Sequence, residues 1–478
     1  MRLRLRGLRL CLCWRWTLAE TSMTITATGW MERIFTVFRK SNPSFPPSPG
    51  LYTYHHIEEG GKARLHLRIE SDQSGTLLIN ASRIYHFNPT AAGMAYLTLN
   101  HTPVDRAVDH ITRAFRVSRA QAVADYTAFT HQMDLLVSPD AGCPVCELEV
   151  DTIPPFSRQP TRPYRMDLAL TYRCNHQCSH CYNARSRSFP ELNTRYWLQV
   201  LDKLWEIGIP HIVFTGGEPT LRNDLPELIA HAEKNGQITG INTNGTRLKD
   251  PAYAQSLVDA GLDHVQITLE SHLPEIHDRM VVHPGAWQST IAGLQNALST
   301  RLYVMTNTTL LMDNAPYLSE TLDYLAHLGV PTIGLNALIY SGRGLNVNTG
   351  IPEKDLPALL NIARAKTERN GQRLIWYTPT EYCNFDPVQM ELGVKGCTAA
   401  LYNMCIEPDG SVLPCQSYYT SLGNILDQPW ASIWNHDLAI ALRERHNLPE
   451  KCHDCALVAE CGGGCPLARQ ITGSPANT

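Results

Sequence analysis

The sequence lacks long apolar runs and a marked excess of charge of either sign, and each absence excludes a class of function. No apolar stretch is long enough to span a bilayer as a helix. The 41 Lys and Arg residues are balanced by 45 Asp and Glu residues, a formal net charge of −4, which argues against general nucleic-acid binding. The chain has no internal repeat of solenoid length. Its 43% of hydrophobic residues is typical of a folded protein.

The N-terminus also lacks an export signal. Its first 20 residues contain five arginines without the continuous apolar segment of a secretory signal. They resemble either an organelle transit peptide or sequence upstream of a true start at Met23 or Met31, and we favour the latter. We therefore expect a cytoplasmic protein with reduced thiols, in which clustered cysteines indicate metal or redox chemistry. Cysteine, with 15 copies, is the over-represented residue.

Two proline-rich stretches, at residues 43–49 and 139–163, predict linkers. Between them the first clear pattern is a half-buried strand, in which apolar and polar residues alternate. The apolar set is Leu65, Leu67 and Ile69, and the polar set is Arg64, His66 and Arg68. Residues 76–79 and 84–87 are predicted to form further short strands.

Three helices are predicted to follow these strands. Asn88 and Pro89 are typical of an N-cap and a first helical residue, and Ser118 with Gln121 forms a capping box. Apolar residues recur at helical spacing in two further segments. The predicted apolar face of the first is Val104, Ala107, Val108, Ile111 and Phe115, and that of the second is Val123, Tyr126, Phe129, Met133 and Leu136. This order resembles the pyrroloquinoline quinone peptide-chaperone fold, the recognition element for ribosomally made, modified peptides. A generic winged-helix-like module without a peptide partner is the alternative.

After the second linker, strands and helices alternate. Strands are predicted at residues 166–170, 211–215, 238–242, 264–269, 302–310 and 332–339, with helices such as 196–207 and 314–328 between them. Six successive β/α units predict a parallel α/β sheet, either doubly wound or a partial (β/α)6 TIM-like barrel. Such folds carry their chemistry at the carboxyl ends of the strands.

The first cysteine cluster follows the first of these strands. Cys174, Cys178 and Cys181 have the spacing C-x3-C-x2-C on a loop. Soft thiolates select iron–sulfur clusters, zinc or copper(I), and a structural zinc site would want a fourth local ligand. Three reduced core thiols or a zinc loop are the alternatives to a cluster. The motif resembles that of the radical S-adenosylmethionine (SAM) superfamily, which implies that these three cysteines hold a [4Fe–4S] cluster whose open iron binds SAM.

The resemblance extends to the ends of later strands. His180 occupies the family's aromatic position near the adenine, and Glu218 would accept a hydrogen bond from the SAM ammonium group. The implied SAM-binding set is His180, Gly216, Gly217, Glu218, Pro219, Asn242, Asn244, Thr268 and Glu270. Glu270 and Ser271 depart from the family pattern of Ser-Leu-Asp-Gly. Gly342-Arg343-Gly344 matches a motif of many relatives, although the arginine could equally be a solvated loop cation.

The C-terminal cysteines resemble the SPASM extension of radical SAM peptide maturases, which holds two auxiliary [4Fe–4S] clusters. By position, the nearer cluster would use Cys397, Cys405, Cys415 and Cys465, and the farther one Cys452, Cys455 and Cys461. A hairpin is predicted around the Pro-Asp-Gly turn at Gly410. A pair of zinc knuckles is the alternative.

The farther cluster lacks the family's last cysteine. Its fourth iron could be completed by Cys383, by the linker pair Cys143 and Cys146, by water or another non-cysteine group, or by a substrate thiolate. We favour an open iron that a peptide cysteine or water occupies, because an open position on a catalytic metal is where substrate usually binds.

Together these patterns predict a radical SAM/SPASM enzyme that modifies a ribosomally made precursor peptide and receives electrons from a reductant such as flavodoxin or ferredoxin. The alternatives are modification of tetrapyrrole side chains, as in haem pathways, and a non-catalytic iron–sulfur carrier or scaffold. The expected domains are a disordered extension (1–50), the recognition domain (51–138), a linker (139–164), the radical SAM core (165–370), the SPASM domain (371–470) and a tail (471–478).

Overall fold

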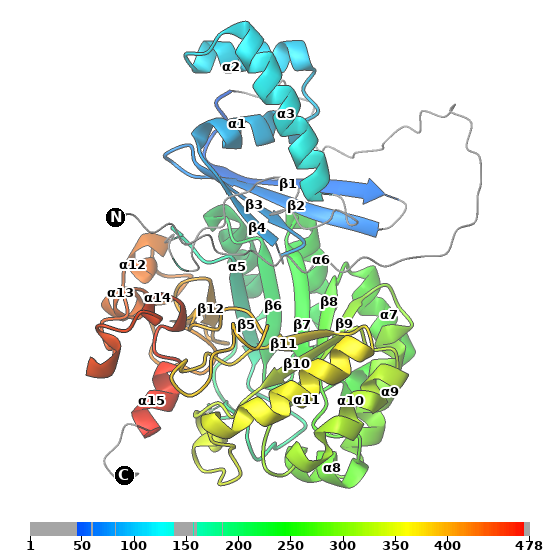
Figure 1. The fold of residues 1–478 in the computed structure, drawn as a ribbon. Coiled ribbons are helices and arrows are strands. Elements are labelled where there is room, and N and C mark those ends of the chain that lie inside the picture. The colour runs from blue at the N-terminus through cyan, green and yellow to red at the C-terminus, as the bar shows by residue number, and fades with distance from the viewer. Residues whose placement is uncertain are drawn as a thin grey trace, which may run out of the picture. The chain divides into compact units, whose positions relative to one another are not determined.

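The computed structural model describes residues 45–58, 61–81, 83–137, 156, 160–183 and 185–472. The chain divides into two compact units, residues 1–153 and 154–478 (Figure 1). Most of the predicted extension and linker, including Cys143 and Cys146, lies outside the described residues. No helix in the described part of the chain is long and apolar enough to cross a membrane.

The N-terminal unit is a four-stranded antiparallel sheet followed by three helices. The strands pair in chain order: β1 (Gly50–Glu58), β2 (Gly61–Ile69), β3 (Gly75–Ile79) and β4 (Arg83–Phe87). The helices are α1 (Pro89–Leu99), α2 (Val104–Ala114) and α3 (Arg119–Val137). The three predicted strands and three predicted helices are present, and β1 is an additional strand. Both β1 and β4 are edges of the sheet.

Local capping explains where these helices begin. The Asn88 side chain accepts a hydrogen bond from the Ala91 N–H at 2.8 Å, with Pro89 at the first helical position. The Ser118 hydroxyl accepts one from the Gln121 N–H at 3.2 Å. Side-chain acceptors at these positions satisfy N–H groups that have no partner within the helix. The predicted Asn88 cap and the serine half of the predicted capping box are confirmed, whereas the Gln121 side chain donates to Asp125 at 2.6 Å.

Two burial predictions in this unit are wrong. The polar residues of β2, Arg64, His66 and Arg68, are as fully buried as the apolar residues between them, so β2 is covered on both faces rather than half-buried. Val123 is 39% exposed, whereas Tyr126 and Met133 of the same helix lie in the core. Because Ala122 is fully buried, the buried stripe of α3 begins one residue before Val123. In the other predicted stripe, Val104 of α2 is likewise 49% exposed.

The C-terminal unit is built on a nine-stranded sheet. Seven successive strands are parallel: β5 (Arg165–Thr171), β6 (His211–Gly216), β7 (Ile238–Thr243), β8 (His264–Thr268), β9 (Tyr303–Thr309), β10 (Thr332–Asn336) and β11 (Arg373–Trp376). The intervening helices are α5 (Thr194–Ile207), α6 (Leu225–Asn235), α7 (Pro251–Asp259), α8 (Pro274–Val281), α9 (Ala286–Leu298), α10 (Leu318–His327) and α11 (Leu356–Arg369). The predicted parallel α/β sheet is confirmed, with β11 as a seventh strand and β10 ending at Asn336 rather than at 339.

The cysteine-rich region continues this sheet. Strand β12 (Asn403–Ile406) pairs in parallel with β5, and β13 (Val412–Leu413) pairs antiparallel with β12, around Gly410 with a φ of +91°. This is the predicted hairpin. The helices α12 (Trp430–Trp434), α13 (Asp437–Arg443), α14 (Val458–Cys461) and α15 (Pro466–Thr472) follow. The sheet edge thus joins the two cysteine-bearing regions directly.

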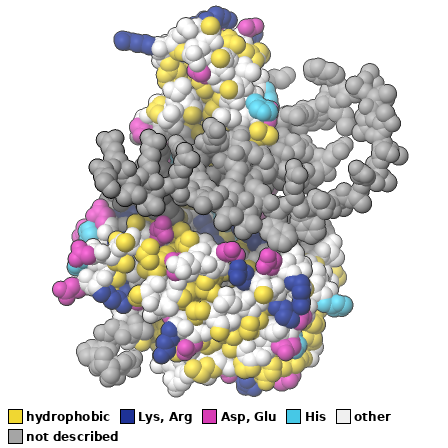
Figure 2. Space-filling model, viewed as in Figure 1, with side chains coloured by type: hydrophobic (Ala, Val, Ile, Leu, Met, Phe, Trp, Pro, Cys, Tyr) yellow, Lys and Arg dark blue, Asp and Glu magenta, His cyan; other side chains and the backbone are white. Residues whose placement is uncertain are grey.

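Apolar strands and amphipathic helices explain the core. Strand β10 is buried throughout and β5 is buried apart from its first residue, as expected for parallel strands covered on both faces. Helix α5 buries Trp197, Leu201 and Leu204 against the sheet. On the face drawn in Figure 2, acidic and basic side chains are interspersed and form no continuous basic surface.

Candidate active site

A cavity of about 1350 Å³ lies at the carboxyl ends of the parallel strands, where such sheets bind ligands. Most of the predicted site residues line it: Cys174, Cys178, His180, Cys181, Gly216, Gly217, Glu218, Asn242, Asn244, Thr268, Glu270, Cys397, Cys415 and Cys465. The predicted residues that do not line it are Pro219, Cys405, Cys452, Cys455 and Cys461. The first cysteine loop and part of the C-terminal cysteine region therefore face one space.

The main chain of the first cysteine loop is held from several directions. The Arg187 guanidinium donates to the carbonyl of Cys174 at 2.6 Å. Arg343 donates from its side chain to the Cys178 carbonyl at 2.9 Å and from its backbone N–H to the Cys181 carbonyl at 2.9 Å. These bonds fix the backbone of all three cysteines through carbonyl oxygens, so their thiols remain available for metal. Arg343, although exposed to solvent, is therefore also a structural part of the loop.

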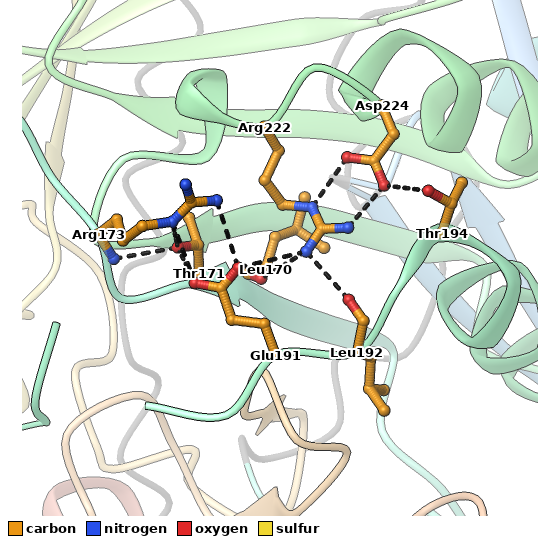
Figure 3. A network of polar contacts seen from close by, with 8 residues as sticks. All are labelled: Leu170, Thr171, Arg173, Glu191, Leu192, Thr194, Arg222 and Asp224. Carbon is orange, nitrogen blue, oxygen red and sulfur yellow. Dashed lines mark hydrogen bonds and ion pairs between the residues drawn. The ribbon is translucent and has the colours of Figure 1, made fainter. Parts of the chain in front are cut away.

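Behind this loop lies a polar network centred on Arg222, which is 8% exposed (Figure 3). Arg222 donates two hydrogen bonds to Asp224, at 2.9 and 2.6 Å, and one each to the carbonyls of Leu192 and Leu170, at 3.1 and 3.4 Å. Burial acts to raise the pKa of Asp224, but the hydrogen bonds from Arg222 and Thr194 keep it below its usual value. The carboxylate is thus held in its charged form.

Glu191 extends this network to the start of the cysteine loop. It accepts a hydrogen bond from the Thr171 hydroxyl and lies 3.4 Å from the Arg173 guanidinium and 3.6 Å from that of Arg222. Arg173 directly precedes Cys174. None of Thr171, Arg173, Glu191 and Arg222 lines the cavity, so the network supports the loop from outside it. No periodic pattern or motif in the sequence indicates this network.

Replacing Arg222 with alanine should lower the free energy of unfolding by about 3 kcal/mol, because it leaves the half-buried Asp224 carboxylate and two carbonyls without their donor. Urea unfolding of the metal-free protein would measure this difference. The matched control is Arg195→Ala, an exposed arginine on α5, which should change stability by less than about 0.5 kcal/mol. Equal stability of the two variants would contradict the support role.

The glycines after β6 permit close contact with the cysteine loop. A Cβ on Gly216 would lie 2.1 Å from the Thr171 carbonyl oxygen, and one on Gly217 would lie 2.3 Å from that of Arg173. Gly216 also has a φ of +128°. Any side chain at either position would push the two loops apart. The close contact between the loops therefore requires glycine at both positions.

Glu218 has a different environment from the one that the sequence suggested. Its Oε1 accepts hydrogen bonds from Thr220 N–H and Oγ1 and from the Thr243 hydroxyl, and its Oε2 accepts one from the Asn244 N–H at 2.8 Å. Burial raises the pKa of Glu218, and these donors oppose that rise. The carboxylate therefore ties the β6 turn to the β7 turn, which leaves only its Oε2 side for a ligand ammonium.

Asn244 in turn contacts the first cysteine loop. Its side-chain NH2 donates to the Asn175 side chain at 2.8 Å, and its side-chain oxygen accepts from the Thr246 N–H at 2.9 Å. Asn175 directly follows Cys174. Glu218, Asn244 and Asn175 thus form a chain of contacts from β6 through β7 to the cluster loop.

His180 and Glu270 form a buried pair that the sequence did not reveal. His180 Nε2 lies 2.9 Å from Glu270 Oε1, and Glu270 Oε2 accepts from the Thr309 N–H at 2.9 Å. The Glu270 N–H donates to His277 Nδ1 at 3.2 Å. Glu270, which departs from the family pattern, therefore holds the histidine of the cysteine motif in place. Burial also lowers the pKa of His277, which favours the neutral ring.

The chemistry of the cavity fits a cluster with an exchangeable ligand. Burial raises the pKa of the Cys174 and Cys178 thiols, so they lose protons only when a metal binds. Nδ1 of His180 and Nε2 of His277 are buried without a hydrogen-bond partner in the described structure. The cavity therefore offers three thiols that can bind a metal cluster and two ring nitrogens that can form hydrogen bonds to a polar ligand.

The nearer C-terminal cysteines also gather at the cavity. Burial, with a smaller effect of Cys465, raises the pKa of Cys397 to about 11. Burial, with smaller effects of Cys397 and Cys465, raises the pKa of Cys415 to about 12. Cys405 does not line the cavity, and its thiol packs in an apolar group with Ala169, Tyr172 and Leu413. Burial, Asp167 and the nearby Cys415 all raise its pKa, and its assignment to the nearer cluster stays a prediction. Among the described residues, no group of three or more His, Cys, Asp or Glu is arranged to hold a single metal ion.

One further contact joins the cysteine-rich region to the parallel strands. Arg185 donates two hydrogen bonds to the buried Glu407, at 2.6 and 2.9 Å, and the Tyr172 hydroxyl donates one to the same carboxylate at 3.0 Å. The pair spans more than two hundred positions in the sequence, so no local pattern indicated it. It fixes the segment after β12 against the loop that follows the first cysteines.

Comparisons with known proteins agree with this geometry. Residues 168–328 match the Radical SAM superfamily, and residues 397–456 match the SPASM iron–sulfur cluster-binding domain. The PqqA peptide cyclase of Xanthomonas campestris pv. campestris is 30% identical over 338 residues, which cover 66% of this chain and 83% of that protein. The Fe-coproporphyrin III synthase of Methanosarcina barkeri is 29% identical over 324 residues, which cover 62% of this chain and 81% of that protein.

The fold is also found in a solved structure. Streptococcus suis SuiB bound to the precursor peptide SuiA aligns with a TM-score of 0.65 at 15% identity, over 86% of this chain and 96% of that one. Residues 154–478 are about two thirds of the chain, so this alignment extends into the N-terminal unit. Fold and site together define an iron–sulfur enzyme of the α/β class.

More particularly, the chain belongs to the radical SAM superfamily, in the group that carries a C-terminal SPASM domain. Its cofactors are therefore SAM, the [4Fe–4S] cluster that binds it, and auxiliary [4Fe–4S] clusters.

Proposed function

We propose that this enzyme modifies a ribosomally made precursor peptide, whose leader segment binds the N-terminal unit. The observation that carries the proposal is a separate antiparallel sheet, in which β1 and β4 are the edge strands among the described residues, in the same chain as a radical SAM/SPASM unit. An extended peptide can add to such an edge through main-chain hydrogen bonds. Ile84, 41% exposed on β4, offers an apolar contact beside that edge.

Within the catalytic unit, each group of residues has a proposed role. Cys174, Cys178 and Cys181 hold the SAM-binding cluster, and Glu218, Asn244 and the two glycines shape the pocket beside it. When bound, SAM and the cluster supply the radical that takes a hydrogen atom from the substrate. The Glu270–His180 pair orients the ring next to the third cysteine. Cys397, Cys415 and Cys465 face the same cavity, and so place the nearer auxiliary cluster beside the substrate.

The relatives support a peptide substrate, with one competing class. PqqA peptide cyclases are named for a peptide, and SuiB was solved with a precursor peptide. Fe-coproporphyrin III synthase is similar to the same degree, which keeps tetrapyrrole side chains as the second candidate substrate. A tetrapyrrole needs no leader-binding sheet, so the N-terminal unit favours the peptide. A small redox protein such as flavodoxin or ferredoxin is the proposed reductant.

The test is co-expression of the enzyme with the short peptides encoded beside its gene, followed by mass spectrometry of those peptides. We expect a mass change in one peptide that depends on Cys174, Cys178 and Cys181. In parallel, the purified enzyme with SAM, reductant and coproporphyrin should leave the porphyrin unchanged. A modified porphyrin with unmodified peptides would replace the peptide proposal by the tetrapyrrole one.

A further inference from the structure

The farther cysteines, Cys452, Cys455 and Cys461, form a group with an unfilled position. The Cys455 N–H donates to the Cys452 carbonyl at 3.3 Å, which holds these two cysteines in one turn. Burial raises the pKa of Cys452, and Cys461 and Cys455 add to that rise. A [4Fe–4S] cluster without an exchangeable ligand takes four thiolates. None of these three residues lines the active-site cavity, although Lys451 and Glu381 beside them do.

The chain from Thr380 to Cys383 passes directly against this group. The Tyr382 N–H donates to the Cys461 sulfur at 3.4 Å, and the Cys461 thiol donates to the Thr380 carbonyl at 3.5 Å. A Cβ on Gly464, which has a φ of +71°, would lie 2.8 Å from Cγ of Glu381. This segment is therefore packed against Cys461 by contacts on both sides of Glu381, and its position is set by the cysteine group itself.

Lys451 links Cys383 to the farther cysteines. Its Nζ lies 3.7 Å from the Cys383 sulfur and 3.2 Å from Oε2 of Glu381, and the next residue in the chain is Cys452. Cys383 therefore directly follows Tyr382, whose N–H donates to Cys461. It also contacts the lysine that directly precedes Cys452. Its thiol is exposed and does not line the active-site cavity, as is also true of Cys455.

From these contacts we propose that Cys383 is the fourth ligand of the farther auxiliary cluster. The proposal rests on Cys452, Cys455 and Cys461 being its other three ligands, and it replaces the open iron favoured from the sequence. On binding iron, the Cys383 thiol releases its proton to solvent. Four thiolates give the cluster a net negative charge, which the Lys451 ammonium offsets. A cluster with four protein thiolates has no site for substrate and transfers electrons only.

The first test needs no substitution. The enzyme with its clusters and the enzyme after removal of iron by a chelator are each treated with iodoacetamide, and labelled cysteines are identified by peptide mass spectrometry. Cys383 and Cys455 should be labelled in the iron-free protein and protected in the cluster-loaded protein. Equal labelling of Cys383 in both forms, with Cys455 protected, would overturn the proposal.

The second test counts iron in a protein whose Cys174, Cys178 and Cys181 are alanine, so that only auxiliary clusters remain. This parent should bind about eight irons per chain, and adding Cys383→Ala should lower that to between about four and seven, by loss of the cluster or of one iron. Electron paramagnetic resonance would show a three-iron form directly. The matched control, Cys143→Ala with Cys146→Ala, should retain the iron content of the parent.

Three outcomes would overturn the ligand assignment. They are unchanged iron and spectra in Cys383→Ala, loss of iron only in the linker double variant, and a parent that holds about four irons with one zinc. The Cys383→Ser variant guards against misfolding, because its thermal unfolding should match that of the parent while the reduction potential of its cluster shifts. None of these measurements uses a peptide, so they are independent of whether the proposed substrate is correct.

Discussion

Replacing Cys178 with alanine should reduce the formation of deoxyadenosine from SAM to the rate seen without enzyme. A cluster bound by two thiolates instead of three is not retained with an open iron for SAM. The backbone of the loop should survive, because Cys178 is held through its carbonyl by Arg343 rather than through its side chain. Chromatography of an anaerobic reaction with SAM and dithionite measures the product.

The control for this prediction is Ser188→Ala, an exposed position in the segment after the loop, which should keep the full rate of SAM cleavage. Circular dichroism of both variants would show that the fold is unchanged. Cleavage by the Cys178 variant at more than a small fraction of the normal rate would mean that another set of cysteines holds the catalytic cluster.

Deleting residues 51–138 should spare SAM cleavage but slow modification of the full-length precursor by on the order of a hundredfold or more. Leader binding tethers the core of the peptide to the enzyme and raises its effective concentration, and the deletion removes that tether. The N-terminal unit is compact by itself, so its loss should leave the catalytic unit folded. Mass spectrometry of the precursor over time gives the rate for each enzyme.

A leaderless core peptide provides the internal control. At high concentration, the full-length and truncated enzymes should modify it at similar rates, because neither can use the leader. If the truncated enzyme modified the full-length precursor as fast as the complete one, the N-terminal unit would have no role in peptide recognition.

The sequence predicted most of the strands, and the exceptions have physical reasons. The six predicted parallel strands are dense in Val, Ile and Leu, which buried parallel strands require. Strand β1 was missed because Tyr52, Thr53, Tyr54, His55 and His56 show no apolar alternation. Strand β11 was missed because it has only four residues. Strand β2 is buried on both faces, and the alternation of apolar and polar residues along one strand does not reveal whether its polar face is also covered.

In the active site, spacing predicted the residues better than their partners. Cys174, Cys178 and Cys181 were found because a local loop presents them at fixed intervals. The pairing of His180 with Glu270 joins positions 90 residues apart, and the contact of Lys451 with Cys383 joins positions 68 residues apart. Such contacts arise only when strands assemble, so sequence order could not distinguish Cys383 from the linker pair or a substrate thiolate.

The pairing of β12 with β5 has a consequence for biosynthesis. Strand β5 leaves the ribosome long before Asn403, and at ordinary translation rates the delay is roughly 10 to 50 s. During that interval one edge of β5 has no neighbour, although the rest of the parallel sheet can assemble on its other side. An unpaired edge is a template for aggregation. Nascent chains that stall before Asn403 should therefore depend strongly on chaperones, and the ribosome-bound enzyme should become resistant to proteolysis only after β12 emerges.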